Sequence, residues 1–203
     1  MSESLPSEPE PERSRRRLPV VLAAVAAVLV LALAVTVPVL ARQVSGDESS
    51  GPANLDAVQF FKDVDNGHTE RDVDYEQVPP IGGPHDPAWL DCGRYDDPVR
   101  DENAVHDLEH GSIWITYDPD LAADDVDTLE SVLPDNAILS PYDGLPAPVV
   151  VTVWARQLQL TGVDDPRLEM FLETYADGRT SPEPFASCAG GVSEPDGGNT
   201  TQV

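Results

Sequence analysis

The sequence predicts an α+β sandwich, with helices over one face of a largely antiparallel sheet and a single transmembrane helix before it. Three observations predict this fold. An uncharged apolar run lies near the N-terminus, two later segments are rich in β-branched and aromatic residues, and segments with apolar residues at helical spacing alternate with them. In chain order the elements read β-α-β-β-α, within one domain over residues 55–188.

The uncharged run extends from Leu18 to Ala41. A helix that rises ~1.5 Å per residue needs about 20 such residues to cross a bilayer, so we expect one crossing. Four arginines precede the run and only Arg42 follows it closely, which favours a disordered cytoplasmic tail over residues 1–17 and an extracytoplasmic domain. A cleaved signal peptide is the alternative, although its apolar region is usually about 7–15 residues long.

The chain is strongly acidic, with a formal net charge of −25 and a single lysine, Lys62. Phosphate binding depends on Lys and Arg, so nucleic acid is excluded as a partner, and the lipid bilayer is expected to be contacted only through the N-terminal helix. Residues 42–54 have the composition of a flexible stalk, and residues 189–203 that of a disordered acidic tail. The sequence identifies no protein partner.

The first half of the domain is less regular than the second. The apolar residues of Leu55–Phe61 are spaced for one helical face, with Asn54 as a candidate N-cap. We expect a strand over Asp72–Val78. Pro79–Asn103 is dominated by Pro, Gly and Asp, and loops of this length inside a compact domain are commonly functional.

The second half contains the most regular patterns. Ser112–Tyr117 and Val149–Trp154 are β-branched and aromatic and predict two strong strands. Asp118–Leu133 predicts a helix with an apolar stripe, and Ala137–Leu139 a short strand. A second helix is predicted from Asp164 to Tyr175, which completes the β-α-β-β-α order.

Three histidines fall close together, His85, His106 and His110, and the last two lie in the hexapeptide HDLEHG. On a helical turn, residues at i and i+4 point the same way and can hold a divalent or cuprous ion. Glu109 is offset from that face and is expected to orient a ligand from behind. The motif also matches an inverted zinc-protease signature, but Gly111 and the strand that follows leave no room for the long helix of those enzymes.

Two other interpretations of these histidines stay open. They can be hydrogen-bonded, packed residues at a loop-to-strand corner, or one of them can act as a catalytic base without metal. The two cysteines, Cys92 and Cys188, are expected to form a disulfide that contributes about 4 kcal/mol by closing a long loop. Metal ligation by the sulfurs is the alternative.

Several motifs, taken in order, resemble the bacterial domain-of-unknown-function family 3105. They are Pro79–His85 (PPIGGPH), Cys92-Gly93 with Tyr95, Val105–Gly111 (VHDLEHG), Pro141-Tyr142 and Trp154. The resemblance covers the region from about Phe61 to Cys188 and implies that His68 belongs to the same set of histidines. It also implies an N-terminal membrane anchor, which members of the family often have, but no established activity.

The sequence therefore predicts a membrane-anchored, extracytoplasmic protein that binds copper or zinc and is not expected to be an enzyme. The predicted ligands are His68, His85, His106 and His110, with Glu109 behind them, and no catalytic residue or organic cofactor is predicted. A metal-free structural or interaction domain at the cell surface is the alternative function, and an uncharacterised hydrolase is a third.

Overall fold

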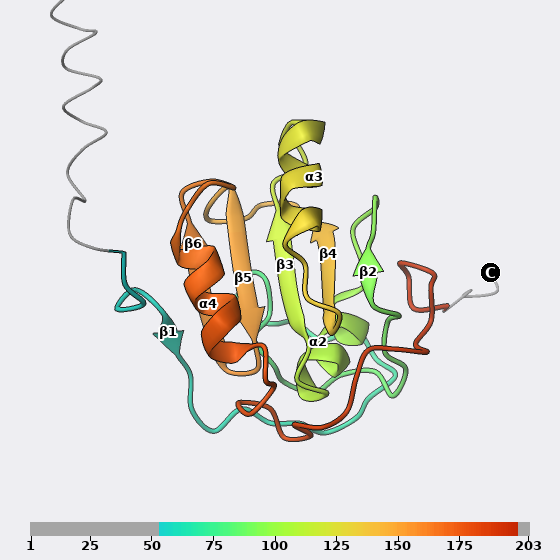
Figure 1. The fold of residues 1–203 in the computed structure, drawn as a ribbon. Helices are drawn as coiled ribbons and strands as arrows, with labels where there is room; N and C mark the ends of the chain where they lie inside the picture. The colour runs from blue at the N-terminus through green and yellow to red at the C-terminus, as the bar shows by residue number, and fades with distance from the viewer. Residues whose placement is uncertain (1–52, 199–203) are drawn as a thin grey trace, which may run out of the picture. The chain divides into compact units, whose positions relative to one another are not determined.

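The computed structural model describes residues 53–198, which contain a six-stranded mixed sheet in the order β1-β6-β5-β3-β4-β2 and three helices (Figure 1). The elements in chain order are β1 (Gln59–Phe60), β2 (Gly93–Arg94), α2 (Asp101–Glu109), β3 (Ile113–Tyr117), α3 (Ala123–Ser131), β4 (Ala137–Pro141), β5 (Val149–Val153), β6 (Arg156–Leu160) and α4 (Arg167–Tyr175).

The centre of the sheet is a β-α-β unit followed by a hairpin. β3 and β4 are parallel and are joined by α3, whereas β5 pairs antiparallel with β3 and with β6. The two short edge strands also pair in opposite senses: β1 is antiparallel to β6, and β2 is parallel to β4. Every residue of β3, β4 and β5 is buried, as expected for a sheet that is covered on both faces.

One face of the sheet is purely apolar and is covered by α3 and α4, which lie in front of it in Figure 1. The alternating residues Ile113, Ile115 and Tyr117 of β3 point to this face. The packing against them comes from Val126 and Leu129 of α3 and from Leu168, Phe171 and Leu172 of α4. This core supports the sheet but holds none of the predicted site residues.

The other face carries a second core with more polar content. Trp114 and Ile138 lie on it and pack with Val105 and Leu108 of α2 and with Leu90 of the long loop. Trp114 donates a hydrogen bond from Nε1 to Ser140 Oγ at 3.0 Å. The predicted site residues lie in the layer that covers this face, made of α2 and the loops before it.

The predicted fold class was wrong in three respects. The sheet is mixed rather than largely antiparallel, its helices cover both faces rather than one, and β2, α2 and β6 are additional elements. Leu55–Phe61 contains the strand β1 instead of a helix, because its backbone pairs with β6, and Asp72–Val78 is not a strand. The five elements predicted between residues 112 and 175 correspond to β3, α3, β4, β5 and α4.

Within residues 53–198, none of the helices is both long enough and apolar enough to cross a membrane. The predicted transmembrane segment, Leu18–Ala41, and the tail before it lie outside the described residues.

Candidate metal centre

Helix α2 carries His106 and Glu109, two residues of the candidate metal centre, and is buried along almost its whole length. Every residue from Glu102 to Glu109 is buried, although five of these eight are polar or charged. Asp101 and Glu102 lie in the first turn, where carboxylates interact favourably with the helix dipole. The helix ends at Glu109, and Gly111 then takes a positive φ of 81°, which glycine adopts without a steric penalty.

The buried polar side chains of α2 bind the backbone of the preceding loops. Glu102 Oε1 accepts a hydrogen bond from Val73 N at 2.7 Å, and Asn103 Nδ2 donates one to Ala88 O at 2.7 Å. Asp107 Oδ2 accepts a third from Leu90 N at 3.1 Å. A buried polar group without such a partner is costly, so these bonds explain how so polar a helix is buried and fix the loops against it.

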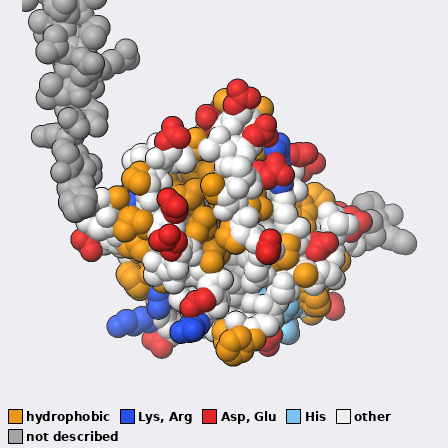
Figure 2. All heavy atoms as spheres, in the orientation of Figure 1, with side chains coloured by type: hydrophobic (Ala, Val, Ile, Leu, Met, Phe, Trp, Pro, Cys, Tyr) orange, Lys and Arg blue, Asp and Glu red, His pale blue; other side chains and the backbone are white. Residues whose placement is uncertain are grey.

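Four side chains then converge at one point between α2 and these loops. One potential ligand atom from each of His68, His85, His106 and Glu109 lies within 4.8 Å of all the others. His85 Nε2 is 2.9 Å and His68 Nε2 is 3.5 Å from Glu109 Oε2. Figure 2 shows histidine atoms reaching the surface at the lower right of that view, beside acidic side chains.

Two of the histidine rings are fixed by backbone carbonyls. His85 Nδ1 lies 2.8 Å from Gly83 O, and His106 Nδ1 lies 2.7 Å from Asp86 O. A carbonyl oxygen only accepts hydrogen bonds, so in both rings Nδ1 carries the proton. When either ring is neutral, its Nε2 therefore has a free lone pair, the form in which histidine binds metals.

Glu109 is held in the corresponding way. Asn66 Nδ2 donates a hydrogen bond to Glu109 Oε1 at 2.9 Å, which leaves Oε2 facing the histidines. Burial raises the pKa of Glu109, but the bond from Asn66 and the nearby His85 outweigh it, and the pKa lies below its usual range. Glu109 is therefore a carboxylate at neutral pH.

A proton or a metal cation must occupy the space between His85 and Glu109. With Nδ1 protonated, a neutral His85 presents a lone pair to a carboxylate oxygen only 2.9 Å away. Two lone pairs at this distance repel each other unless a positive charge lies between them. Burial lowers the pKa of His106 to about 4, although the hydrogen bond to Asp86 O opposes this shift. His106 is therefore neutral at pH 7 and adds a third lone pair to the centre.

His68 reaches the centre from the preceding loop. Its backbone forms an isolated parallel bridge with His85, in which Thr69 N donates to His85 O at 2.7 Å and His85 N donates to Gly67 O at 3.1 Å. This pairing places the two rings edge to face, with centroids 4.8 Å apart. The side chain of His68 is 52% exposed.

His110 lies outside the group. Its ring packs against His106, with centroids 4.5 Å apart, and against Trp89 at 5.1 Å. Its Nε2 is 3.7 Å from Glu183 Oε2, and its Nδ1 is buried without a hydrogen-bond partner. The structure thus brings together three of the four predicted ligands and places the carboxylate of Glu109, rather than the ring of His110, beside them.

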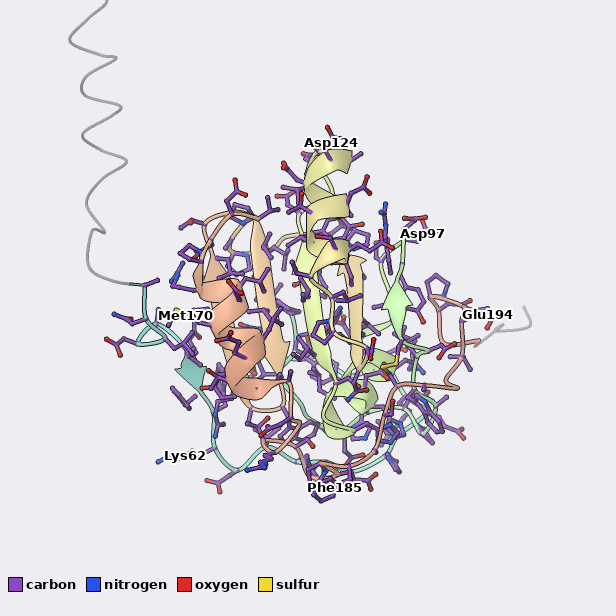
Figure 3. The ribbon with its side chains drawn as sticks, viewed as in Figure 1. Lys62, Asp97, Asp124, Met170, Phe185 and Glu194 are labelled. Carbon is purple, nitrogen blue, oxygen red and sulfur yellow. A yellow bond between two sulfur atoms is a disulfide. The ribbon has the colours of Figure 1, made fainter. Side chains whose placement is uncertain are left out.

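A disulfide links Cys92 to Cys188, with the two Cα atoms 5.0 Å apart, and no free cysteine is found in residues 53–198. It joins the C-terminal segment, residues 176–198, to the loop beside α2. That segment, on which Figure 3 labels Phe185 and Glu194, contacts the centre directly because Glu183 N donates to Glu109 O at 3.0 Å. Both sulfurs are therefore unavailable as thiolate ligands.

Sequence reasoning missed the groups that orient the ligands. Asn66 lies in an irregular segment and has no neighbouring motif, while Gly83 and Asp86 contribute only backbone oxygens. The sole sequence signal was the glycine pair before His85. Gly82 and Gly83 have φ values of 133° and 132°, and a Cβ on Gly82 would lie 2.7 Å from Val64 Cγ1. Any side chain at Gly82 would therefore disturb the turn that positions His85.

Replacing Asp107 by Asn is expected to stabilise the metal-free protein at neutral pH. Burial raises the pKa of Asp107 well above its usual range, and Oδ1 has no hydrogen-bond partner. The native carboxyl thus holds a proton that the unfolded chain releases near pH 4. The contribution of this protonated group to the free energy of unfolding is complete below about pH 4 and is lost as the pH rises through the native pKa. An asparagine amide does not titrate, so the variant does not lose stability in this way.

We expect Asp107→Asn to raise the free energy of unfolding at pH 7 by about 1–3 kcal/mol, with a difference that shrinks toward pH 4. Urea unfolding at both pH values measures it. The exposed Asp97→Asn is the control, expected to change stability by less than about 0.5 kcal/mol. An equal effect of Asp107→Asn at both pH values would contradict the assignment of a buried, proton-holding carboxyl.

Residues 68–190 match the family model described as Protein of unknown function (DUF3105), and the chain belongs to this family. The matched range includes His68, His85, His106 and Glu109 as well as both cysteines. No curated protein and no solved structure matches the chain. The family match identifies the domain but assigns it no activity.

Proposed function

We propose that this DUF3105 domain binds a divalent transition metal, zinc or copper(II), through His68, His85, His106 and Glu109. One observation carries the proposal: His85 Nε2 lies 2.9 Å from Glu109 Oε2 while the proton on His85 Nδ1 is fixed on the opposite side of the ring, so a neutral His85 and the carboxylate face each other with lone pairs. A cation bound by both groups removes that repulsion, and His106 and His68 supply the remaining ligands.

The spacing of the ligand atoms supports a metal ion. Metal–nitrogen and metal–oxygen bonds of about 2.0–2.1 Å place tetrahedral ligands about 3.3 Å apart. The distances of His85 Nε2 and His68 Nε2 from Glu109 Oε2, 2.9 and 3.5 Å, lie on either side of this value. The largest separation in the group is 4.8 Å, so binding requires some closure, for which the exposed His68 has room.

The chemistry of the donors narrows the choice of metal. Imidazole and carboxylate suit zinc and copper(II), whereas copper(I) favours the soft sulfur of thiolates and thioethers. Both cysteines are in a disulfide. The Glu109 carboxylate also contributes one negative charge to a ligand set that otherwise consists of three imidazoles. This charge attracts a divalent cation more strongly than a monovalent one.

The bonds behind the ligands support the same assignment. Ligating histidines almost always donate their other N–H to a carbonyl or carboxylate, and ligating carboxylates are themselves hydrogen-bonded. The Gly83 and Asp86 carbonyls and the Asn66 amide meet this requirement for the three buried ligands. A proton shared between His85 and Glu109 explains the short distance between these two side chains. It does not explain why the neutral ring of His106 converges on the same point.

Metal analysis of paired variants tests the proposal. The full chain, purified without a histidine tag and dialysed against zinc or copper(II), is expected to contain one equivalent of metal, and His106→Ala none. His110→Ala is the matched control: it removes a neighbouring imidazole that lies outside the group, and we expect it to retain the metal. Equal metal content in His106→Ala and the unsubstituted chain would contradict the proposal.

Asn66→Ala is expected to weaken metal binding by about 10–100-fold, the usual effect of removing a hydrogen bond behind a ligand. The fold should be retained, because Asn66 is exposed and its described side-chain bond is to Glu109. Competition with a chromophoric chelator measures the affinity. Asn54→Ala, which removes an exposed amide that bonds only Asp56 N, should bind the metal like the unsubstituted chain.

A further inference from the structure

The four ligands of the centre differ sharply in exposure. His85 and Glu109 have side-chain exposures of 0% and 4%, and His106 is 5% exposed as a whole residue. The side chain of His68 is 52% exposed. Solvent, and anything dissolved in it, therefore reaches the centre from the side of His68.

The ligands also differ in how their side chains are held. The three buried ones each make a hydrogen bond away from the centre, to Gly83 O, Asp86 O or Asn66 Nδ2. For His68 the described residues provide no such bond: its ring packs against the rings of His85 and His106, and its Nε2 lies 3.5 Å from Glu109 Oε2. Its backbone is fixed by the bridge to His85, so the ring can turn away without the loop moving.

We propose that His68 is the exchangeable ligand of the centre, and that metal is passed to or from an external donor that takes its place. This rests on the proposed metal binding. An incoming nitrogen, oxygen or sulfur donor gives an electron pair to the metal while His68 Nε2 keeps its own pair and turns outward. Coordination number is preserved at that step, and the remaining ligands are then replaced from the same side.

The surroundings of this opening restrict the donor. An open pocket of about 760 Å³ is lined by Asp86, whose backbone oxygen holds His106, although none of the four ligands lines it. Glu70, Asp72 and Asp196 also line the pocket, and Arg100 is the basic residue among them. Such a surface attracts hydrated cations and repels anions, so the exchanging donor is a neutral or cationic chelating group, such as an imidazole-bearing ligand, rather than a polyanion.

Transfer kinetics on the full chain test this role. The chain loaded with one zinc ion is mixed with terpyridine, a neutral chelator, over a range of concentrations. For the unsubstituted chain, the rate of zinc transfer should rise with terpyridine concentration and exceed the rate with EDTA, a polyanion, at low salt. His68→Ala should still bind one zinc ion and release it about tenfold faster or more, because affinity losses appear mainly in dissociation rates.

His85→Ala is the matched control, which removes a buried ligand and should abolish zinc binding. The exchange role is wrong if His68→Ala loses zinc as completely as His85→Ala does. It is equally wrong if transfer from the unsubstituted chain does not depend on terpyridine concentration and matches that from His68→Ala. If the unsubstituted chain binds no zinc, the proposed function itself fails, which is a distinct result.

Discussion

Loss of the Cys92–Cys188 disulfide is expected to lower the free energy of unfolding by about 4–5 kcal/mol, because the bond closes a loop across a sequence separation of 96 residues. Domains of this kind have total stabilities of about 5–15 kcal/mol, so the loss is a large fraction of the whole. Guanidinium unfolding of the chain and of a Cys92→Ser/Cys188→Ser double variant measures the difference.

The double variant should nevertheless fold, because hydrogen bonds independent of the sulfurs hold the C-terminal segment. Asp91 N donates to Val192 O at 2.8 Å, and Val192 N donates to Trp89 O at 2.9 Å. Added reductant should lower the unfolding midpoint of the unsubstituted chain to that of the variant and leave the variant unchanged. Identical midpoints for the oxidised and reduced chain would show that the bond contributes nothing to stability.

The regular elements could be predicted from sequence wherever burial follows a simple period. β3 and β5 are rich in β-branched residues, β4 begins with the short apolar run Ala137–Leu139, and α3 and α4 have apolar stripes, so their patterns alone identified them. The sheet type could not be predicted in this way. Whether β4 pairs parallel or antiparallel with β3 depends on the path of α3 between them, and the alternation of side chains is the same in both cases.

Helix α2 was missed for a physical reason that also explains its role. Its sequence, DENAVHDLE, has too few apolar residues for a stripe, and such patterns are normally assigned to solvent. Here the polar side chains face loop backbone, and the partners of Glu102, Asn103 and Asp107 are the main-chain groups of Val73, Ala88 and Leu90. A partner that is a backbone atom leaves no trace in the residue pattern.

The choice between Glu109 and His110 shows the same limit at the centre. Glu109 lies three residues and His110 four residues after His106, so both spacings fit one face of a helix. The imidazole of His110 was favoured because histidine is the commoner metal ligand. The helix ends at Glu109, however, and the chain then turns at Gly111, so His110 packs against Trp89 while the carboxylate meets His85. The residues of the centre could be shortlisted from sequence, but the position of the helix end decided which of them converge.

Zinc is expected to stabilise the folded chain by about 2.7 kcal/mol when free zinc is 100 times the dissociation constant, and by about 4.1 kcal/mol at 1,000 times. The reason is that the ligands come from separate segments: His68 and His85 from two loops, and His106 and Glu109 from α2. The unfolded chain cannot hold these segments together, so the metal binds the native state and shifts the unfolding equilibrium by mass action. Thermal unfolding with increasing zinc measures the effect.

The same titration on two variants separates the centre from general binding by an acidic surface. His110→Ala keeps all four converging groups and should show the full zinc-dependent shift, whereas His85→Ala should show none. Weak binding of zinc to exposed carboxylates would stabilise both variants alike, because their surface charge is the same. A shift that persists in His85→Ala would therefore place the stabilising ion elsewhere on the protein, while its loss there and retention in His110→Ala would assign it to this centre.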